Sequence, residues 1–169
     1  KAAVDNGADC VYLGFHDATN ARNFAGLNFD EAAIAQGIAY AHQRGCKVLL
    51  ALNTYPQPAA TALWRSAIDR AARAGIDAVI LADPGLMQYA AEHHPNLRLH
   101  LSVQGSATNV EAINYFHRNF GIARAVLPRV LSVAQVEHVI RNTPVEIEVF
   151  GFGSLCVMVE GRCALSSYA

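Results

Sequence analysis

The chain has 169 residues, of which 53% are hydrophobic and 16% charged, and 13 Lys and Arg against 14 Asp and Glu leave a formal net charge of −1. This composition is typical of a soluble chain that forms a core, and it excludes a disordered protein. We expect a cytoplasmic protein with no membrane span and no nucleic-acid partner, because the sequence has no Lys/Arg block, no signal peptide and no apolar run of roughly 20 residues.

Short apolar runs typical of β-strands alternate with longer segments whose apolar residues recur at helical spacing. The first residues, Lys1 to Asn6, have the pattern of a helix end. The expected strands are Cys10 to Gly14, Lys47 to Asn53, Ala78 to Ala82, Arg98 to Val103, Ala123 to Pro128 and Glu146 to Phe150. The expected helices are Phe29 to Gln43, Ala59 to Ala74, a segment that starts at Pro84 and ends before Pro95, Asn109 to Phe120, and Ser132 to Asn142.

This alternation predicts successive βα units, which need a parallel sheet covered by helices. We expect a truncated (β/α)8 barrel, because a complete barrel takes about 250 residues. Residues 1–169 are interpreted as one incomplete domain, with a first strand before Lys1 and a C-terminal part both missing. A doubly wound open sheet is the alternative fold, although no Gly-x-Gly-x-x-Gly turn follows any expected strand.

Polar side chains follow several of the expected strands at the edge where ligands bind in either fold. They are Asn53, Asp83, Gln104 and Arg129. We predict that they line a substrate pocket, in which Arg129 contacts a carboxylate or phosphate. The alternative is structural: Asp83 would cap the helix that starts at Pro84, and Asn53 and Gln104 would hydrogen-bond the backbone of loops.

Neither the histidines nor the serines show a catalytic or metal-binding pattern. His93 and His94 are expected at a helix end and His100 within a strand, and no histidine has cysteine or carboxylate neighbours at metal-ligand spacing. We interpret them as structural. A serine hydrolase is not indicated either, since Ser154 follows the second glycine of Gly151-Phe152-Gly153 and no Gly-x-Ser-x-Gly elbow is formed.

The most informative segment runs from Glu148 to Tyr168, where a strand leads into a glycine-rich turn that is followed by Cys156 and Cys163. Both thiols are expected near the ligand-binding edge, and Arg162 beside Cys163 favours a thiolate. Ligation of a metal cluster is chemically reasonable here. However, this spacing is not a generic zinc or ferredoxin pattern, and a cluster normally needs four ligands. Cys10 and Cys46 are interpreted as small buried apolar side chains.

The same segment resembles a known family. Gly153-Ser154-Leu155-Cys156 and Glu160-Gly161-Arg162-Cys163 are similar to the signature of the collagenase-like "U-thirty-two" peptidase family. Further similarity, which covers nearly the whole chain, points to the members that act in ubiquinone biosynthesis; it includes Thr19 to Arg22, Phe24 to Phe29, Ile80 to Asp83, Ser102 to Gln104 and Val126 to Leu131.

The resemblance implies a (β/α)8 barrel that binds a [4Fe–4S] cluster and acts with a UbiV-like partner in the oxygen-independent hydroxylation of a ubiquinone precursor. A prephenate-like acid is the implied hydroxyl donor. Cys156 and Cys163 match two of the four cluster ligands, and the other two belong to a region that this chain lacks. We expect Arg129 to contact the carboxylates of the donor.

Other functions remain open. A collagenase-like peptidase would need a nucleophile and a base, and Cys156 with a distant histidine is the candidate pair. Hydroxylation of RNA bases is known for other family members, although a net charge of −1 disfavours it. A non-catalytic subunit that binds a partner is a further possibility.

Overall fold

The structure, a computed structural model, describes residues 1–23 and 29–153 of the chain. The strands are β1 (Cys10–Leu13), β2 (Lys47–Leu52), β3 (Ala78–Leu81), β4 (Arg98–Leu101), β5 (Arg124–Val126) and β6 (Glu146–Glu148). The helices are α1 (Ala2–Asp5), α2 (Glu31–His42), α3 (Thr61–Ala74), α4 (Pro84–His93), α5 (Val110–Phe120) and α6 (Val133–Asn142), with a 3-10 turn η1 (Val103–Gly105). Across these ranges, no helix combines the length and the apolar character needed to cross a bilayer.

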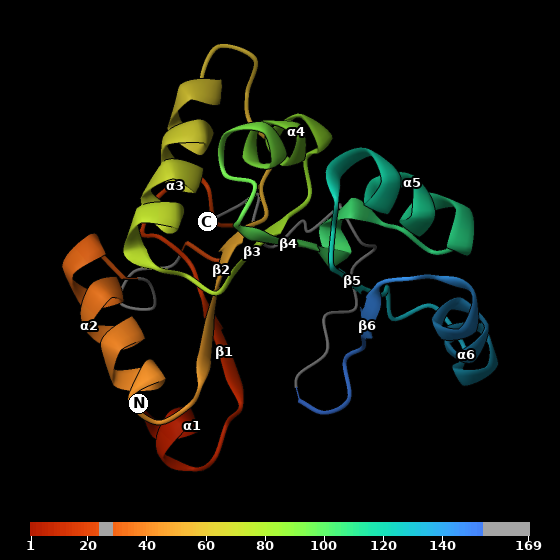
Figure 1. Cartoon of the computed structure of the whole chain (residues 1–169), viewed down its shortest axis with the longest axis horizontal. Coiled ribbons are helices and arrows are strands. Elements are labelled where there is room, and N and C mark those ends of the chain that lie inside the picture. The colour runs from red at the N-terminus through yellow and green to blue at the C-terminus, as the bar shows by residue number, and fades with distance from the viewer. Residues whose placement is uncertain (24–28, 154–169) are drawn as a thin grey trace.

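The strands pair side by side in the order in which they occur in the chain, β1-β2-β3-β4-β5-β6, and each pair is parallel. Helices α2 to α6 follow one another along the outer side of this sheet (Figure 1). A doubly wound sheet would reverse its strand order at a switch point, so the unbroken order contradicts that alternative. The architecture is a half-barrel of the (β/α)8, or TIM-barrel, type, which confirms the predicted fold class.

The expected strands and helices are all present, and several end earlier than predicted for identifiable reasons. The fourth strand was expected to reach Val103, but Ser102 starts η1 by accepting a hydrogen bond from the backbone N–H of Gln104. The helix starts follow capping preferences: Asp30, Asp83, Asn109 and Ser132 each accept a hydrogen bond from the first turn of the helix that they precede.

The apolar core lies between the sheet and the helices. Alternate strand residues, including Leu50, Val79 and Leu101, pack there against Ile68, Met87 and other side chains of the helices. Ile68, Leu50 and Leu101 are fully buried, which is the pattern expected for the helix-covered face of a parallel sheet. This outer face therefore provides the main hydrophobic stabilisation of the fold.

The remaining strand residues lie on the opposite, inner face, because successive side chains of a strand point to opposite sides. The strand register aligns them in rows across the sheet. Apart from Lys47 at the start of β2, the inner side chains of β2 and β3 are small or apolar: Leu49, Ala51, Ala78 and Ile80. On β4 to β6 they are mostly polar or charged: Arg98, His100, Arg124, Glu146 and Glu148.

Candidate active site

The structure places the four predicted pocket residues along one edge of the sheet. Asn53 directly follows β2, Asp83 follows β3 by one residue, Gln104 lies in η1 beyond β4, and Arg129 follows β5. Because the strands are parallel and adjacent, their carboxyl ends share this edge, which is the ligand-binding side of a (β/α)8 barrel. All four side chains are half-buried. Their role in binding substrate stays a prediction.

Two of these residues also have the structural roles that were considered as alternatives. The Asp83 carboxylate accepts a hydrogen bond from the backbone N–H of Leu86 at 2.9 Å and caps α4, whose first residue is Pro84. The Asn53 side-chain oxygen accepts a hydrogen bond from the backbone N–H of Ala21 at 3.0 Å. Both side chains thus fix backbone at the edge of the sheet, each through one side-chain oxygen.

Tyr55 is a residue at this edge that the sequence analysis did not single out. Its hydroxyl donates a hydrogen bond to the backbone oxygen of Gln104 at 2.9 Å, which joins the segment after β2 to the turn after β4. Burial and the nearby negative charge of Asp83 raise the pKa of Tyr55, so its hydroxyl stays protonated as a donor. The sequence feature that could have identified Tyr55 is its position two residues beyond the expected strand Lys47 to Asn53.

Arg129 lies at the β5 side of the same edge. Its guanidinium carbon is 4.9 Å from the centre of the Phe150 ring, a cation–π geometry that orients the side chain. A guanidinium carries five N–H donors in a planar fork, which matches the geometry of a carboxylate or phosphate. Its contact with a carboxylate or phosphate stays a prediction.

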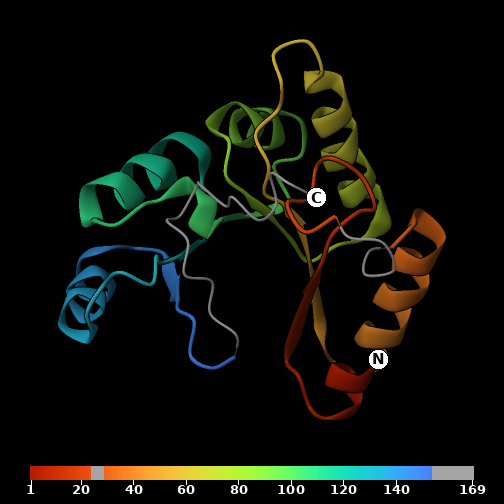
Figure 2. The same ribbon diagram turned by 180° about the vertical axis from the view of Figure 1, so that it is seen from behind.

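The segment after β1 is held against the segment after β2 and against α3, as the view from behind shows (Figure 2). Thr54 donates a hydrogen bond from its hydroxyl to the backbone oxygen of Ala18 at 2.7 Å, and the indole N–H of Trp64 donates to Thr54 at 2.9 Å. These contacts extend the bond between Asn53 and Ala21. They bring residues 17–23 to the ligand-binding edge.

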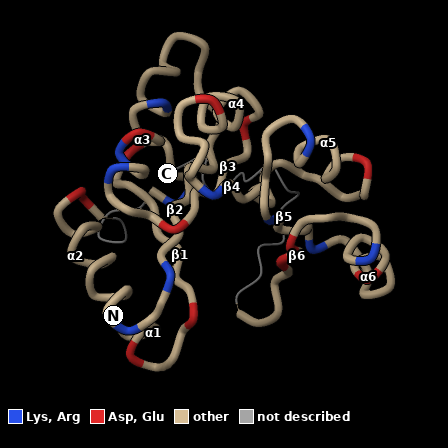
Figure 3. The backbone as a smooth tube through the Cα atoms, in the orientation of Figure 1, with Lys and Arg blue, Asp and Glu red and all other residues tan. Residues whose placement is uncertain are grey.

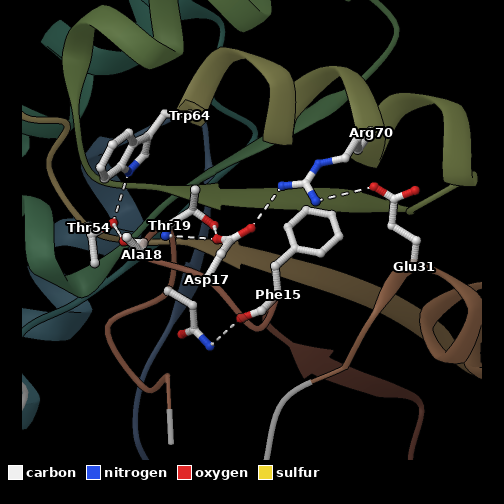
Figure 4. A network of polar contacts seen from close by, with 9 residues as sticks. Phe15, Asp17, Ala18, Thr19, Glu31, Thr54, Trp64 and Arg70 are labelled. Atoms are coloured by element: carbon white, nitrogen blue, oxygen red, sulfur yellow. Dashed lines mark hydrogen bonds and ion pairs between the residues drawn. The ribbon is translucent and has the colours of Figure 1, made fainter. Parts of the chain in front are cut away.

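A half-buried ion pair anchors the same segment (Figure 4). Arg70 of α3 contacts the Asp17 carboxylate at 2.9 Å and the Glu31 carboxylate at 3.2 Å, and its guanidinium lies 4.1 Å from the centre of the Phe15 ring. Burial alone would raise the pKa of Asp17, but hydrogen bonds from Thr19 and Arg70 outweigh it and lower that pKa. Sequence reasoning missed this network because its partners are far apart in the chain.

Charged side chains gather on β4, β5 and β6, with arginines on β4 and β5 and glutamates on β6. Figure 3 marks basic and acidic positions along the backbone. Arg124 contacts Glu146 at 2.7 Å and Glu148 at 3.0 Å, and Arg98 contacts the other oxygen of Glu146 at 2.7 Å. The hydrogen bonds from Arg124 and Arg98 lower the pKa of Glu146 to about 2. We call Arg98, Arg124, Glu146 and Glu148 the charged layer.

Two of the four cysteines, Cys10 and Cys46, lie within the described residues. Cys156 and Cys163, the predicted cluster ligands, lie outside the described residues. Cys46 is buried, as predicted, but Cys10 is exposed, so its interpretation as a buried apolar side chain was wrong. Cys10 begins β1 on the inner face, which the helices do not cover. Within residues 1–23 and 29–153, no group of three or more His, Cys, Asp or Glu could hold a metal ion.

Comparison with known proteins gives the context for this geometry. The sequence profile of "Peptidase family U32" matches residues 1–169. The tRNA hydroxylation protein P of Escherichia coli K12 is 34% identical over 170 residues, which cover 99% of this chain and 37% of that protein. A protein of Porphyromonas gingivalis named "Collagenase" is 35% identical over 176 residues, covering 98% of this chain and 41% of the relative.

The fold comparison agrees. The solved structure of the U32 peptidase Mk0906 superposes with a TM-score of 0.72 at 18% sequence identity, over 88% of this chain and 64% of that one. At this identity the likeness supports the fold alone. The chain spans about two fifths of the length of the curated relatives described above.

Proposed function

Because the chain belongs to peptidase family U32, we propose that it forms the barrel segment of a UbiU-like iron–sulfur protein. This protein would support oxygen-independent hydroxylation of a ubiquinone precursor together with a UbiV-like partner. Hydroxylation is supported by the similarity over 99% of the chain to a relative named for the hydroxylation of tRNA, and the quinone substrate by the sequence resemblance described above. The choice of a small-molecule substrate over RNA is supported by the net charge of −1 and by the mixture of basic and acidic positions along the chain.

The proposed cofactor is a [4Fe–4S] cluster. Cys156 and Cys163 would supply two thiolate ligands, and two more would come from parts of the protein beyond this chain. In the part of the chain that the structure describes, no group of three or more His, Cys, Asp or Glu forms an alternative metal site. When bound, the cluster would supply one-electron redox chemistry. The chain's own described residues would bind and orient the substrates.

Arg129 is the residue that we assign to the acidic donor molecule. Its guanidinium is oriented by Phe150, and two hydrogen bonds in parallel from a guanidinium to a carboxylate fix both position and orientation. The segments after β1, β2 and β4 are joined by the hydrogen bonds of Asn53, Thr54 and Tyr55. They form a preorganised wall on the other side of this edge, which reduces the entropy lost on binding.

The test of the function uses the full-length protein, purified without oxygen and combined with its UbiV-like partner. Hydroxylation of a ubiquinone precursor, hydroxylation of tRNA and cleavage of gelatin are measured in parallel. We expect product from the quinone precursor that depends on the partner. Activity on tRNA alone would place the protein with the relatives named for that reaction, and gelatin cleavage that depends on Cys156 would support a peptidase; either result overturns the proposal.

The role of Arg129 is tested separately with Arg129→Ala in the same assay. We expect a rise of about tenfold or more in the KM for the acidic donor, because loss of a charged hydrogen-bonded contact weakens binding by about 1.5–3 kcal/mol. Arg141→Ala is the matched control, since Arg141 lies on the outer helix α6 and pairs with Glu137. An Arg129→Ala protein that retains its cluster and unchanged kinetics would refute the assignment.

A further inference from the structure

His100 lies on the inner face of the sheet, beside the charged layer. In the strand register it pairs with Ile80 of β3 and Arg124 of β5, and its neighbours Leu99 and Leu101 pack into the apolar core on the other face. The residue is only 2% exposed. His100 lies two residues before Ser102, which is at the ligand-binding edge of the sheet.

The hydrogen bond between Arg98 and His100 fixes the position of the imidazole proton. The Nε atom of Arg98 donates to Nε2 of His100 at 3.1 Å. A guanidinium nitrogen can only donate, so Nε2 must be the unprotonated, accepting nitrogen. Burial, and then the positive charges of Arg124 and Arg98, lower the pKa of His100 to about 4. The ring is therefore neutral at pH 7 and carries its proton on Nδ1.

This Nδ1–H group has no acceptor among the described residues, although the atom is buried. A buried donor without a partner costs about 1–3 kcal/mol, and the great majority of buried polar groups avoid this cost. Arg98 thus holds His100 in the tautomer that presents an unpaired donor. The opposite tautomer would set an Nε2 proton against the Arg98 donor, so the hydrogen bond from Arg98 excludes it. The unpaired Nδ1–H therefore points to an acceptor on a ligand.

The surroundings of His100 indicate what that ligand would carry. The nearby charges include Arg124, Arg98 and Lys47 against Glu146, which gives a positive potential at the ring. On the adjacent strand β3, the inner position before Ile80 is Ala78, and Ala82 directly follows the strand. Ile80 itself lies directly opposite His100, so the small side chains are the diagonal neighbours of the ring.

We propose that the Nδ1–H of His100 donates a hydrogen bond to an anionic oxygen, of a carboxylate or a phosphate, on the molecule that binds at this edge of the barrel. Arg98 is then a positioning residue that sets the tautomer. The inference deepens the proposed function and rests on it for the existence of a small acidic substrate. A neutral imidazole is suited to this role because it donates without bringing a further buried charge.

Two substitutions distinguish this role from a structural one. In His100→Asn, the side-chain amide nitrogen can take the place of Nδ1 and donate as it does. In His100→Gln, the side chain is one methylene longer, so its amide reaches the position of Nε2 and its oxygen can accept from Arg98. If His100 serves the ligand, His100→Asn keeps binding within about threefold of the wild type and His100→Gln loses about tenfold. If His100 only supports Arg98, the order is reversed, which overturns the proposal.

The measurement is a titration of the full-length protein with benzoate and, separately, with inorganic phosphate, followed by the ring ¹H and ¹⁵N resonances of His100. We expect the free protein to show a proton on Nδ1 between pH 6 and 8, and one of the two probes to shift the Nδ1–H resonance. The probe that shifts it identifies the class of anion. A proton on Nε2, or no shift with either probe, overturns the proposal.

His138→Gln is the control, because His138 is exposed on α6, and it should leave both titrations unchanged. Binding of these probes requires no turnover, so the inference and the proposed function can fail separately. If the His100 variants show the expected order but the protein does not hydroxylate a quinone precursor, only the function is wrong. If hydroxylation is present and His100→Gln binds as well as the wild type, only the inference is wrong.

Discussion

The two faces of the sheet are formed by alternate residues of the same strands, and they differ in polarity. The outer face is uniformly apolar from β2 to β5 and packs against the helices. The inner face changes character along the strand order, from Leu49 and Ala78 on β2 and β3 to the charged layer on β4 to β6. The outer face is built for burial alone. The inner face gives up part of that stabilisation to position polar groups below the ligand-binding edge.

This comparison predicts that the outer face dominates stability. Leu50→Ala removes a fully buried side chain from the apolar core, and we expect a loss of about 3–4 kcal/mol in the free energy of unfolding. Leu63→Ala on the exposed side of α3 is the control and should change it by about 1 kcal/mol or less. Urea unfolding gives both values. Equal losses for the two variants would contradict the assignment of the core.

The inner face should instead determine how the free energy of unfolding depends on pH, through His100. The folded-state pKa of His100 is about 4, below the ordinary value of 6.5. As the pH falls from 6.5 towards 4, His100 is protonated in the unfolded chain but not in the folded chain. The free energy of unfolding therefore decreases by about 2–3 kcal/mol over this range. His100→Leu should remove that decrease and leave stability at pH 7 equal or higher, because it deletes an unpaired buried donor. Urea unfolding at several pH values tests this; an unchanged slope would contradict it.

Within the charged layer, Arg124 is the central residue because it contacts both Glu146 and Glu148. Arg124→Met leaves two carboxylates side by side, and we expect a loss of about 1–2 kcal/mol, since the layer is partly exposed to solvent. The pKa of Glu146 should also rise towards its ordinary value. Arg141→Met, which breaks an exposed pair on α6, is the control and should have little effect. NMR titration and urea unfolding measure the two changes.

Asp83 gives the smallest expected effect and separates capping from substrate binding. Asp83→Ala removes the cap of α4 and should cost about 1 kcal/mol, as should Ser132→Ala at the start of α6. Asp83→Asn keeps an accepting oxygen and should restore stability. If Asp83→Asn is as stable as the wild type but binds the acidic donor differently, Asp83 also contacts substrate. If neither variant alters binding, its role is capping alone.

Much of the fold follows from local patterns in the sequence. Apolar runs such as Lys47 to Leu52 are long enough to form buried strands, and Asp83-Pro84 marks a helix start without any tertiary information. The alternation of strands and helices then predicts a parallel sheet. The choice between a barrel and an open sheet needed the observed strand order, because both folds share the same alternating pattern.

The candidate site was only partly predictable, because its contacts join residues that are distant in the chain. Asp17 and Arg70 come from β1's following segment and from α3, and nothing local to either residue indicates the other. His100 was interpreted as structural on spacing alone. The alternation of Arg98-Leu99-His100-Leu101 does contain the information that His100 and Arg98 share a face, but the tautomer depends on a distance that only the structure supplies.

The central claim concerns the two cysteines that follow β6, and iron analysis tests it most directly. The full-length protein is purified without oxygen, and its iron content and visible spectrum are compared among the wild type, Cys156→Ala, Cys163→Ala and the control Cys10→Ala. The account predicts a brown protein with about four irons that loses its colour and iron in the first two variants and keeps them in Cys10→Ala. An iron-free wild type, or iron that survives both substitutions, would contradict it.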